Sequence, residues 1–329
     1  MEHLPTLSPD ELAAICARAF PNRRRQNVVN VSSLESRQHE MIAFELWWVD
    51  EEGAFVSENL IVRRYVSTLS WWRPDDRGKA QREATVCRWL SAQGFPVPQV
   101  YAREVGPQGD VVLFSRLPGY GLSIGDRSLR EAAQPYIRTF AGLLAHLHSL
   151  IPPDAVRQVV PQVTLPGALA NLLAIAYQID QPELHAAAER VMELAYDVPE
   201  APPVLVHGDY HLLNALLRGN EIAGVVDWEY CALGDPRWDV ASAYMQLVDF
   251  GAPEEADQFL SAYLDHSGRH FEGPPLYNVV APLQQWAISE WLVQQQAAGE
   301  LPGFALAQDL LDQRDTHRRR AQMAMQWLD

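Results

Sequence analysis

The polar residues between positions 204 and 241 are the ones whose types and spacing could do chemistry. An apolar run ends at Val206, and the polar loop after it presents Asp209 and, five positions later, Asn214. Two short predicted strands then flank a Gly-Asn turn, and the second strand ends on Asp227. Because a β-hairpin returns the chain close to its starting point, we expect Asp227 to lie beside Asp209 and Asn214.

Two carboxylates and an amide oxygen at one place suit a magnesium-dependent phosphoryl transfer. Mg²⁺ is typically bound by a few protein oxygens together with substrate phosphates. In this reaction one carboxylate orients the acceptor hydroxyl and takes its proton, while another carboxylate and an Asn hold the metal. A metal-dependent hydrolase that uses His207, Asp209 and His211 is a competing hypothesis for the same loop.

This segment resembles the signature of the aminoglycoside phosphotransferase and choline kinase-like family. The signature reads H-G-D-x-x-x-x-N, then [IV]-[IV]-D-W-E, then G-D-P-x-x-D, and the chain carries HGDYHLLN, VVDWE and GDPRWD in this order. The resemblance implies that Asp209 is the catalytic base and that Asn214 and Asp227 bind Mg²⁺. It also implies that His207 and Asp239 brace the catalytic loop.

The resemblance extends upstream, over roughly residues 56–243, and implies a nucleotide site. A cation on a strand, Arg63 or its neighbour Arg64, would bind the phosphates of ATP or GTP, and Glu83 on a helix would pair with it. The segment that joins the two parts of the chain would receive the nucleobase. Its residues in this sequence are Phe114, Ser115 and Leu117.

Two departures from the family pattern concern the grip on the nucleotide. The strand cation is an arginine, because the only lysine, Lys79, is expected in a loop before a helix. Arginine binds phosphate with a different geometry. The first predicted hairpin also has no glycine where a phosphate-covering loop should turn, and Ser32, Ser33 or Ser36 could donate hydrogen bonds there instead.

Three further residues are candidates for the acceptor side of the site. Glu229, two positions after Asp227, could touch a second metal ion or a water molecule, or could equally be an exposed carboxylate at a hairpin end. Trp286 and Glu290 lie on a late predicted helix that often lines the acceptor pocket in the family, and core packing is the alternative for both. We interpret His148 and His211 as structural.

The elements around these residues predict an α+β, protein-kinase-like bilobal fold. Residues 1–117 read as a nucleotide-binding lobe with an antiparallel sheet and one main helix, after a first helix that a capping box starts at Ser8. Residues 118–329 read as a larger, mostly helical lobe for catalysis and acceptor binding, with helices expected at 130–151, 168–177, 184–196, 238–250, 256–265 and 277–298.

The charge of the chain bears on its partners. The net charge is −16, and residues 121–329 hold most of it, with 12 Arg and Lys against 27 Asp and Glu. Such a field repels nucleic acid and favours a cationic acceptor. An acidic surface that keeps the protein in solution explains the charge equally well.

Other features of the sequence limit where the protein is expected to be located and which cofactors it is expected to bind. The sequence has no apolar run of about 18 residues and no basic start followed by a cleavable apolar stretch, so we expect a cytoplasmic protein without a membrane partner. Cys16, Cys87 and Cys231 lie far apart and predict neither disulfides nor a zinc site. The oligomeric state is not readable.

The sequence therefore predicts a small-molecule kinase that transfers the γ-phosphoryl group of Mg-ATP or Mg-GTP to a hydroxyl. The acceptor would be a small molecule, and the sequence does not identify it. The negative charge mildly favours an aminoglycoside or an amino alcohol. A nucleotide-binding scaffold of the same fold, without useful catalysis, is the main alternative, since the glycines and the lysine are missing.

Overall fold

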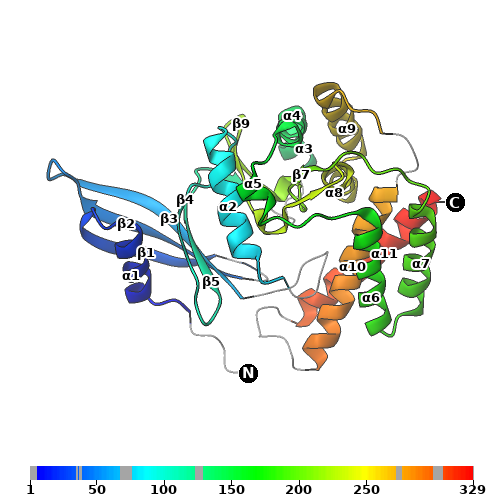
Figure 1. The fold of residues 1–329 in the computed structure, drawn as a ribbon, viewed down its shortest axis with the longest axis horizontal. Coiled ribbons are helices and arrows are strands. Elements are labelled where there is room, and N and C mark those ends of the chain that lie inside the picture. The colour runs from blue at the N-terminus through cyan, green and yellow to red at the C-terminus, as the bar shows by residue number, and fades with distance from the viewer. Residues whose placement is uncertain are drawn as a thin grey trace.

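The computed structural model describes residues 6–34, 36, 39–66, 76–122, 129–271, 276–298 and 307–328. Figure 1 shows a long twisted sheet at one end of the molecule and a larger group of helices at the other, with α2 (Lys79–Ala92) between them. The molecule thus has the predicted bilobal α+β arrangement.

The N-terminal lobe is built on a five-stranded antiparallel sheet in the order β1-β2-β3-β5-β4. Its strands are β1 (Arg24–Leu34), β2 (Glu40–Val49), β3 (Phe55–Tyr65), β4 (Val100–Glu104) and β5 (Asp110–Ser115). Helix α1 (Pro9–Ala19) begins with the predicted capping box, in which Ser8 and Glu11 exchange hydrogen bonds.

The two faces of this sheet pack against different parts of the chain. One face joins α1 in a small core that contains Leu12, Phe44 and Leu60. The other face contributes Val112 and Phe114 to a larger core, which also holds residues of α2 and of the helical lobe. Helix α2 therefore touches both the sheet and the catalytic region, and it packs closely on the residues just after Asp227.

The C-terminal lobe is mostly helical. Its helices are α3 (Leu129–Ala133), α4 (Ile137–Ser149), α5 (Asp154–Arg157), α6 (Leu165–Gln178), α7 (Pro182–Ala195), α8 (Arg237–Asp249), α9 (Pro253–Ser267), α10 (Leu276–Ala297) and α11 (Ala307–Met325). Its strands are β6 (Tyr120–Gly121), β7 (Val204–Val206), β8 (Ala215–Arg218), β9 (Glu221–Val225) and β10 (Ala232–Gly234).

The predicted helices are largely confirmed, with one correction. The stretch at 130–151 is not one helix: α3 ends at Ala133, a 3₁₀ turn covers Gln134–Tyr136, and α4 follows. Pro135 lies at the break because it lacks the N–H that an α-helix needs and its ring crowds the preceding turn. The short strands β6 and β10 were not predicted.

The segment between the lobes is partly structured. Tyr120 and Gly121 form β6, which pairs with β8 of the helical lobe, so the chain is already attached to that lobe before α3 begins. The predicted boundary at residue 117 falls between β5 and β6 and stays a prediction.

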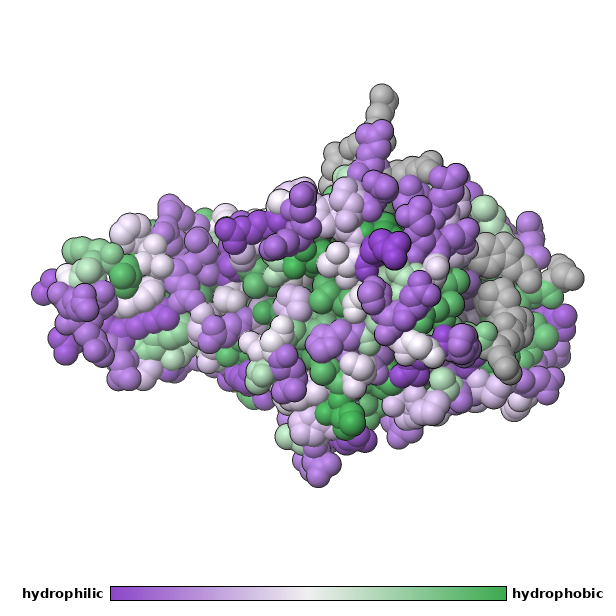
Figure 2. Space-filling view, turned by 90° about the horizontal axis from the view of Figure 1, so that it is seen from above, coloured by the Kyte–Doolittle hydropathy of each residue, from purple (hydrophilic) through white to green (hydrophobic). Residues whose placement is uncertain are grey.

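The surface is polar over most of the view in Figure 2, and its hydrophobic residues form small patches toward the middle of that face. A second large core joins α6, α7, α8 and α10 around residues such as Leu172, Val191 and Trp286. Across the described ranges, none of the helices combines the length and the apolar character that a membrane span requires.

Candidate active site

The loop that carries Asp209 is held by buried hydrogen bonds. Strand β7 pairs with β10 and delivers the loop, and Asp239 of α8 accepts hydrogen bonds from the main-chain N–H groups of His207 at 2.7 Å and Gly208 at 2.8 Å. His148 Nε2 lies 3.2 Å from the same carboxylate. Because Asp239 is fully buried, its two oxygens are committed to positioning this loop.

His207 is a structural part of the loop in these contacts. Its Nδ1 accepts a hydrogen bond from the N–H of Asp209 at 3.2 Å, and its Nε2 donates to the carbonyl of Val226 at 2.9 Å. Burial lowers the pKa of His207, which favours the neutral ring that this pattern requires. Both ring nitrogens are thus used, so His207 is not available as the metal ligand that a hydrolase site would need.

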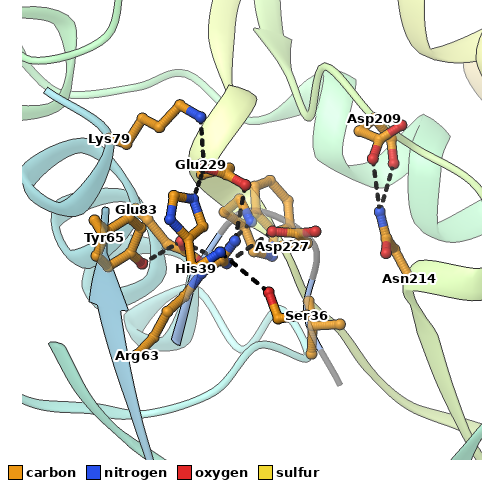
Figure 3. Close-up of polar contacts among 12 residues, drawn as sticks. Ser36, His39, Arg63, Tyr65, Lys79, Glu83, Asp209, Asn214, Asp227 and Glu229 are labelled. Carbon is orange, nitrogen blue, oxygen red and sulfur yellow. Dashed lines mark hydrogen bonds and ion pairs between the residues drawn. The ribbon is translucent and has the colours of Figure 1, made fainter. Parts of the chain in front are cut away.

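Asp209 and Asn214 face each other across the loop (Figure 3). The amide nitrogen of Asn214 donates to Asp209 Oδ2 at 3.2 Å and to the main-chain oxygen of Asp209 at 3.0 Å. His211 Nε2 lies 3.2 Å from the other carboxylate oxygen, Oδ1. The Asp209 side chain keeps 29% of its surface exposed, so a substrate can still reach it.

His211 and Asp209 shift each other's pKa. Burial raises the pKa of Asp209, but the charge of His211 and their hydrogen bond outweigh it, and the net shift is downward. Burial lowers the pKa of His211, but the Asp209 carboxylate outweighs it, and the net shift is upward. Asp209 is therefore ionised at neutral pH. The contact of His211 with Asp209 is a feature that sequence reasoning missed.

Asp227 lies between this pair and the N-terminal lobe (Figure 3). The hairpin of β8 and β9 brings it there, because the N–H of Val226 donates to the main-chain oxygen of Asn214 at 2.9 Å. Asp227 adopts a left-handed conformation with φ of 72°, which ends the strand and turns its carboxylate toward the sheet. Its Oδ1 accepts a 2.7 Å hydrogen bond from Arg63 Nη1.

Arg63 of β3 is the cation that reaches the site. Its Nη1 also donates to Glu83 Oε2 at 3.1 Å, and Tyr65 donates to the same carboxylate. Arg64 points to the opposite face of the strand, where its Nε lies 2.8 Å from Glu40. The alternation of side chains along a strand explains this division, and it selects Arg63 from the two predicted candidates.

The Arg63–Glu83 pair is buried. The two side chains are only 7% and 5% exposed. Burial raises the pKa of Glu83 to about 7, although Arg63 pulls it down. The N–H of Trp228 also donates to Glu83 at 3.2 Å, so Glu83 of α2 links β3 to the chain just after Asp227.

Glu229 is buried, which corrects the interpretation of it as an exposed carboxylate at a hairpin end. Its Oε1 accepts from Arg63 Nη2 at 2.8 Å, and its Oε2 lies 2.6 Å from His39 Nε2 and 3.0 Å from Lys79 Nζ. Burial raises the pKa of Glu229, but Arg63, His39 and Lys79 outweigh it, and the net shift is far downward.

His39 and Lys79 are members of the site that sequence reasoning missed. Lys79 is the first residue of α2, not a loop residue, and its side chain is 2% exposed. Burial lowers the pKa of Lys79 and that of His39, against the opposing charge of Glu229. The only signal in the sequence was that Lys79 is the single lysine of the chain.

Trp286 and Glu290 of α10 are both buried, and the acceptor role predicted for them stays a prediction. Trp286 is 1% exposed and packs in the core of α6, α7 and α10. Glu290 accepts a hydrogen bond from Gln181 at 3.3 Å and lies 3.9 Å from Arg314 of α11. The contacts of Trp286 are those of core packing, which was the alternative predicted for it.

The residues predicted to receive the nucleobase lie at the end of β5. Phe114 is buried in the core, and Ser115 accepts a hydrogen bond from the N–H of Gln99 at 2.9 Å. Leu117 lies against Gly224 of β9. In the first hairpin, Ser32 reaches the carbonyl of Ala43 at 3.5 Å and Ser36 accepts from the N–H of His39 at 3.3 Å, while positions 35, 37 and 38 lie outside the described residues.

The donor set at Asn214 and Asp227 fits a magnesium ion. The amide nitrogen of Asn214 faces Asp209, so its oxygen lies on the other side of the amide, and the Asp227 carboxylate is 32% exposed. Within the ranges listed above, no three His, Cys, Asp or Glu side chains are grouped to hold a metal by themselves. A bound Mg²⁺ would take its remaining ligands from phosphates and water.

The antiparallel lobe, the helical lobe and the Asp-Asn-Asp arrangement between them define a kinase-like phosphotransferase fold. The family model described as "Phosphotransferase enzyme family" matches residues 44–283. The chain belongs to this family.

Several known proteins are similar to this chain. Viomycin phosphotransferase of Streptomyces vinaceus is 28% identical over an alignment of 162 residues. The match covers 45% of this chain and 55% of that protein, so it spans about half of the curated relative. A thermostable mutant of aminoglycoside phosphotransferase APH(4)-Ia, in a complex with AMP-PNP and hygromycin B, superposes with a TM-score of 0.66 at 17% identity, covering 96% of this chain and 98% of that one.

A macrolide 2'-phosphotransferase from Brachybacterium faecium is a further structural neighbour. It has a TM-score of 0.57 at 20% identity and covers 96% of this chain and 98% of that one. At these identities the two structural neighbours establish the fold of the whole chain.

Proposed function

We propose that this protein is a small-molecule kinase that transfers the γ-phosphoryl group of a magnesium-bound nucleoside triphosphate, ATP or GTP, to a hydroxyl of a small acceptor. One observation carries the proposal: the ionised Asp209, held by Asn214 and His211, lies in the same loop-and-hairpin unit as Asp227, which Arg63 and Glu83 tie to the N-terminal lobe. The nucleotide requirement is consistent with a cytoplasmic reaction.

In the proposed reaction Asp209 is the base. Its carboxylate orients the acceptor hydroxyl and receives the proton, the acceptor oxygen bonds to the γ-phosphorus, and the bond to the bridging oxygen breaks to release the nucleoside diphosphate. Arg63 would bind phosphate oxygens, and Asn214 and Asp227 would hold the metal. Mg²⁺, when bound, neutralises charge on the phosphates. His207 and Asp239 keep the loop in place, and residues 114–117 border the nucleobase.

The substitution Asp209→Asn tests the proposal because it keeps the shape and the contact with Asn214 but removes the proton acceptor. We expect nucleotide consumption in the presence of a true acceptor to fall roughly 10²- to 10⁴-fold, while binding of the nucleotide stays within a few fold. Asp257→Asn, on the exposed side of α9, is the matched control and should leave nucleotide consumption unchanged. Turnover by Asp209→Asn close to that of the wild-type protein would contradict the assignment.

For the acceptor, we propose a cationic alcohol such as an aminoglycoside or an amino alcohol. The net charge of −15 in residues 121–329 supports this class. A panel of aminoglycosides, viomycin, macrolides, choline and neutral sugars, scored for nucleotide consumption, decides it. If only neutral alcohols are phosphorylated, the cationic class is excluded.

The scaffold alternative is favoured by one observation, the absence of glycine in the first hairpin. It predicts a thermal shift with Mg-ATP or Mg-GTP but no turnover that depends on Asp209. Slow nucleotide hydrolysis without any acceptor, measured for the wild-type protein and for Asp209→Ala, separates the two functions even before the acceptor is known.

A further inference from the structure

The carboxylate of Glu229 is the point where three side chains of the N-terminal lobe, those of Arg63, His39 and Lys79, meet the catalytic region (Figure 3). We propose that Glu229 is a positioning residue that fixes the guanidinium of Arg63 for the nucleotide phosphates, and that Lys79 acts only through Glu229. The inference rests on the proposed function, because it concerns how Arg63 would hold a nucleotide.

Three carboxylates hold the guanidinium of Arg63. Its Nη1 donates to Asp227 at 2.7 Å and to Glu83 at 3.1 Å, and its Nη2 donates to Glu229 at 2.8 Å. A guanidinium is planar, so bonds at both terminal nitrogens fix the plane of the group as well as its position. Without Glu229 the guanidinium could rotate about the two carboxylates on its Nη1 side.

Glu229 is itself held by other residues of the N-terminal lobe. The oxygen that does not touch Arg63 lies 2.6 Å from His39 and 3.0 Å from Lys79, and these three side chains are at most 3% exposed. Arg82 donates from its Nε to the main-chain oxygen of Glu229 at 2.9 Å. Side chain and main chain are therefore both anchored to the N-terminal lobe, from the start of β2 and from α2.

The sequence also allowed a second metal ion at Glu229. Both carboxylate oxygens already have buried positive or N–H partners, and a buried carboxylate with such partners is stabilised as it stands. A metal ion would have to displace Lys79 or His39 from a site without solvent. The geometry therefore assigns Glu229 to the arginine and not to the metal.

Lys79, the single lysine of the chain, is a second cation on Glu229. Lys79 comes from the first turn of α2, whereas Arg63 comes from β3. The two cations meet on opposite oxygens of one carboxylate. Lys79 thus holds the Glu229 oxygen that does not contact Arg63, and its effect on a nucleotide should pass through Glu229.

The test is a double-mutant cycle on nucleotide affinity, which needs no acceptor. Binding of Mg-AMP-PNP is measured by calorimetry for the wild-type protein, Glu229→Gln, Arg63→Gln, Lys79→Met and the pairs of these variants. We expect Glu229→Gln to weaken binding at least tenfold in the wild-type background and less than twofold in the Arg63→Gln background. Lys79→Met should weaken binding in the wild-type background but not further in the Glu229→Gln background, and Lys79→Arg should retain more affinity than Lys79→Met.

The controls separate folding from positioning. Glu183→Gln, an exposed position on α7, should bind as the wild-type protein does. Circular dichroism and the thermal midpoint establish that each variant is folded, and if Glu229→Gln does not fold, the Lys79→Met and Lys79→Arg pair carries the test through its cycle with Arg63→Gln. A purely structural role would lower the fraction of active protein without changing the dissociation constant.

Two outcomes overturn the inference. If the effects of Glu229→Gln and Arg63→Gln multiply, Glu229 acts independently of Arg63; if Lys79→Met still weakens binding in the Glu229→Gln background, Lys79 acts on the nucleotide directly. A wild-type protein that binds no nucleotide contradicts the proposed function itself, whereas tight binding that Glu229→Gln leaves unchanged contradicts only this inference.

Discussion

Gly208, next to the proposed base, has a backbone conformation that other residues rarely adopt. Its φ is +84°, and a Cβ at this position would lie 2.2 Å from the carbonyl oxygen of Tyr230. Gly208→Ala must therefore displace the loop or the chain after Trp228. We expect a loss of about 3 kcal/mol in the free energy of unfolding, measured by urea denaturation, together with loss of nucleotide consumption.

Two other glycines provide matched controls for this substitution. Gly219 and Gly251 also have positive φ, of +59° and +71°, but a Cβ at either would meet nothing within 4 Å. Alanine there should cost about 1 kcal/mol, from backbone strain alone. Equal losses at all three positions would show that the close approach to Tyr230 does not matter.

Asp239 makes a second prediction at the scale of single residues. Asp239→Ala removes the acceptor for two buried N–H groups, those of His207 and Gly208, and leaves His148 without its carboxylate partner. Since each buried group without a partner costs about 1–3 kcal/mol, we expect the free energy of unfolding to fall by about 3 kcal/mol or more. Chemical denaturation checks this against Asp257→Ala, which removes only an exposed contact to Tyr244 and should change little. A small effect of Asp239→Ala would mean that water replaces the carboxylate.

The contrast between predicted and missed site residues has a physical cause. Asp209, Asn214 and Asp227 follow one another along a short loop and hairpin, and local turn geometry therefore predicts that they converge. His39 and Glu229 touch across 190 positions of sequence, and Lys79 meets Glu229 from the start of a helix. Such contacts depend on how the two lobes pack, which no spacing rule encodes.

At the scale of elements, α8 and α11 meet through a partly buried ion pair. Asp249 Oδ2 lies 3.0 Å from Arg320 Nε, and the two side chains are 15% and 27% exposed. Burial raises the pKa of Asp249 to about 6, although Arg320 pulls it down. The folded state therefore binds this proton more tightly than the unfolded chain does. The stability it contributes is complete below the unfolded pKa of 3.8 and is lost as pH rises through about 6.

Asp249→Asn should remove this dependence on pH. We expect the difference in the free energy of unfolding, variant minus wild-type protein, to increase in favour of the variant between pH 4 and 7, by at most about 3 kcal/mol. Urea denaturation at a series of pH values measures it. A difference that decreases over this range would show that the attraction of Arg320 outweighs the burial of the carboxylate.

The elements themselves were predicted where the sequence pattern is long. Helix α1, with its capping box, and helices α6 to α10 have repeated apolar positions, and their expected spans match the structure within a few residues. Strands β6 and β10 are two and three residues long and exist only because β8 and β7 lie beside them. A periodic pattern cannot develop over so few residues.

At the scale of the whole molecule, buried charged contacts connect the two lobes. In the N-terminal lobe, Arg63 contacts both Asp227 and Glu229. Glu229 is also contacted by His39 and Lys79, and its main-chain oxygen accepts a hydrogen bond from Arg82. Arg63, the proposed phosphate ligand, and Asp227, the proposed metal ligand, therefore contact each other directly. The sequence predicted each lobe separately, but this interface follows from tertiary packing alone.

The uneven charge of the molecule makes the last prediction. Residues 121–329 carry a net charge of −15, and a field of this sign should attract a cationic acceptor over distances comparable to the Debye length, about 10 Å at 0.1 M salt. For a polycationic acceptor we expect kcat/KM to fall roughly tenfold between 20 and about 300 mM ionic strength, because steering weakens as salt screens the field. For a neutral acceptor phosphorylated by the same protein, it should change less than about twofold. Nucleotide kept saturating in both series removes its own salt dependence from the comparison, and parallel curves for the two acceptors would show that the acidic surface has no part in acceptor binding.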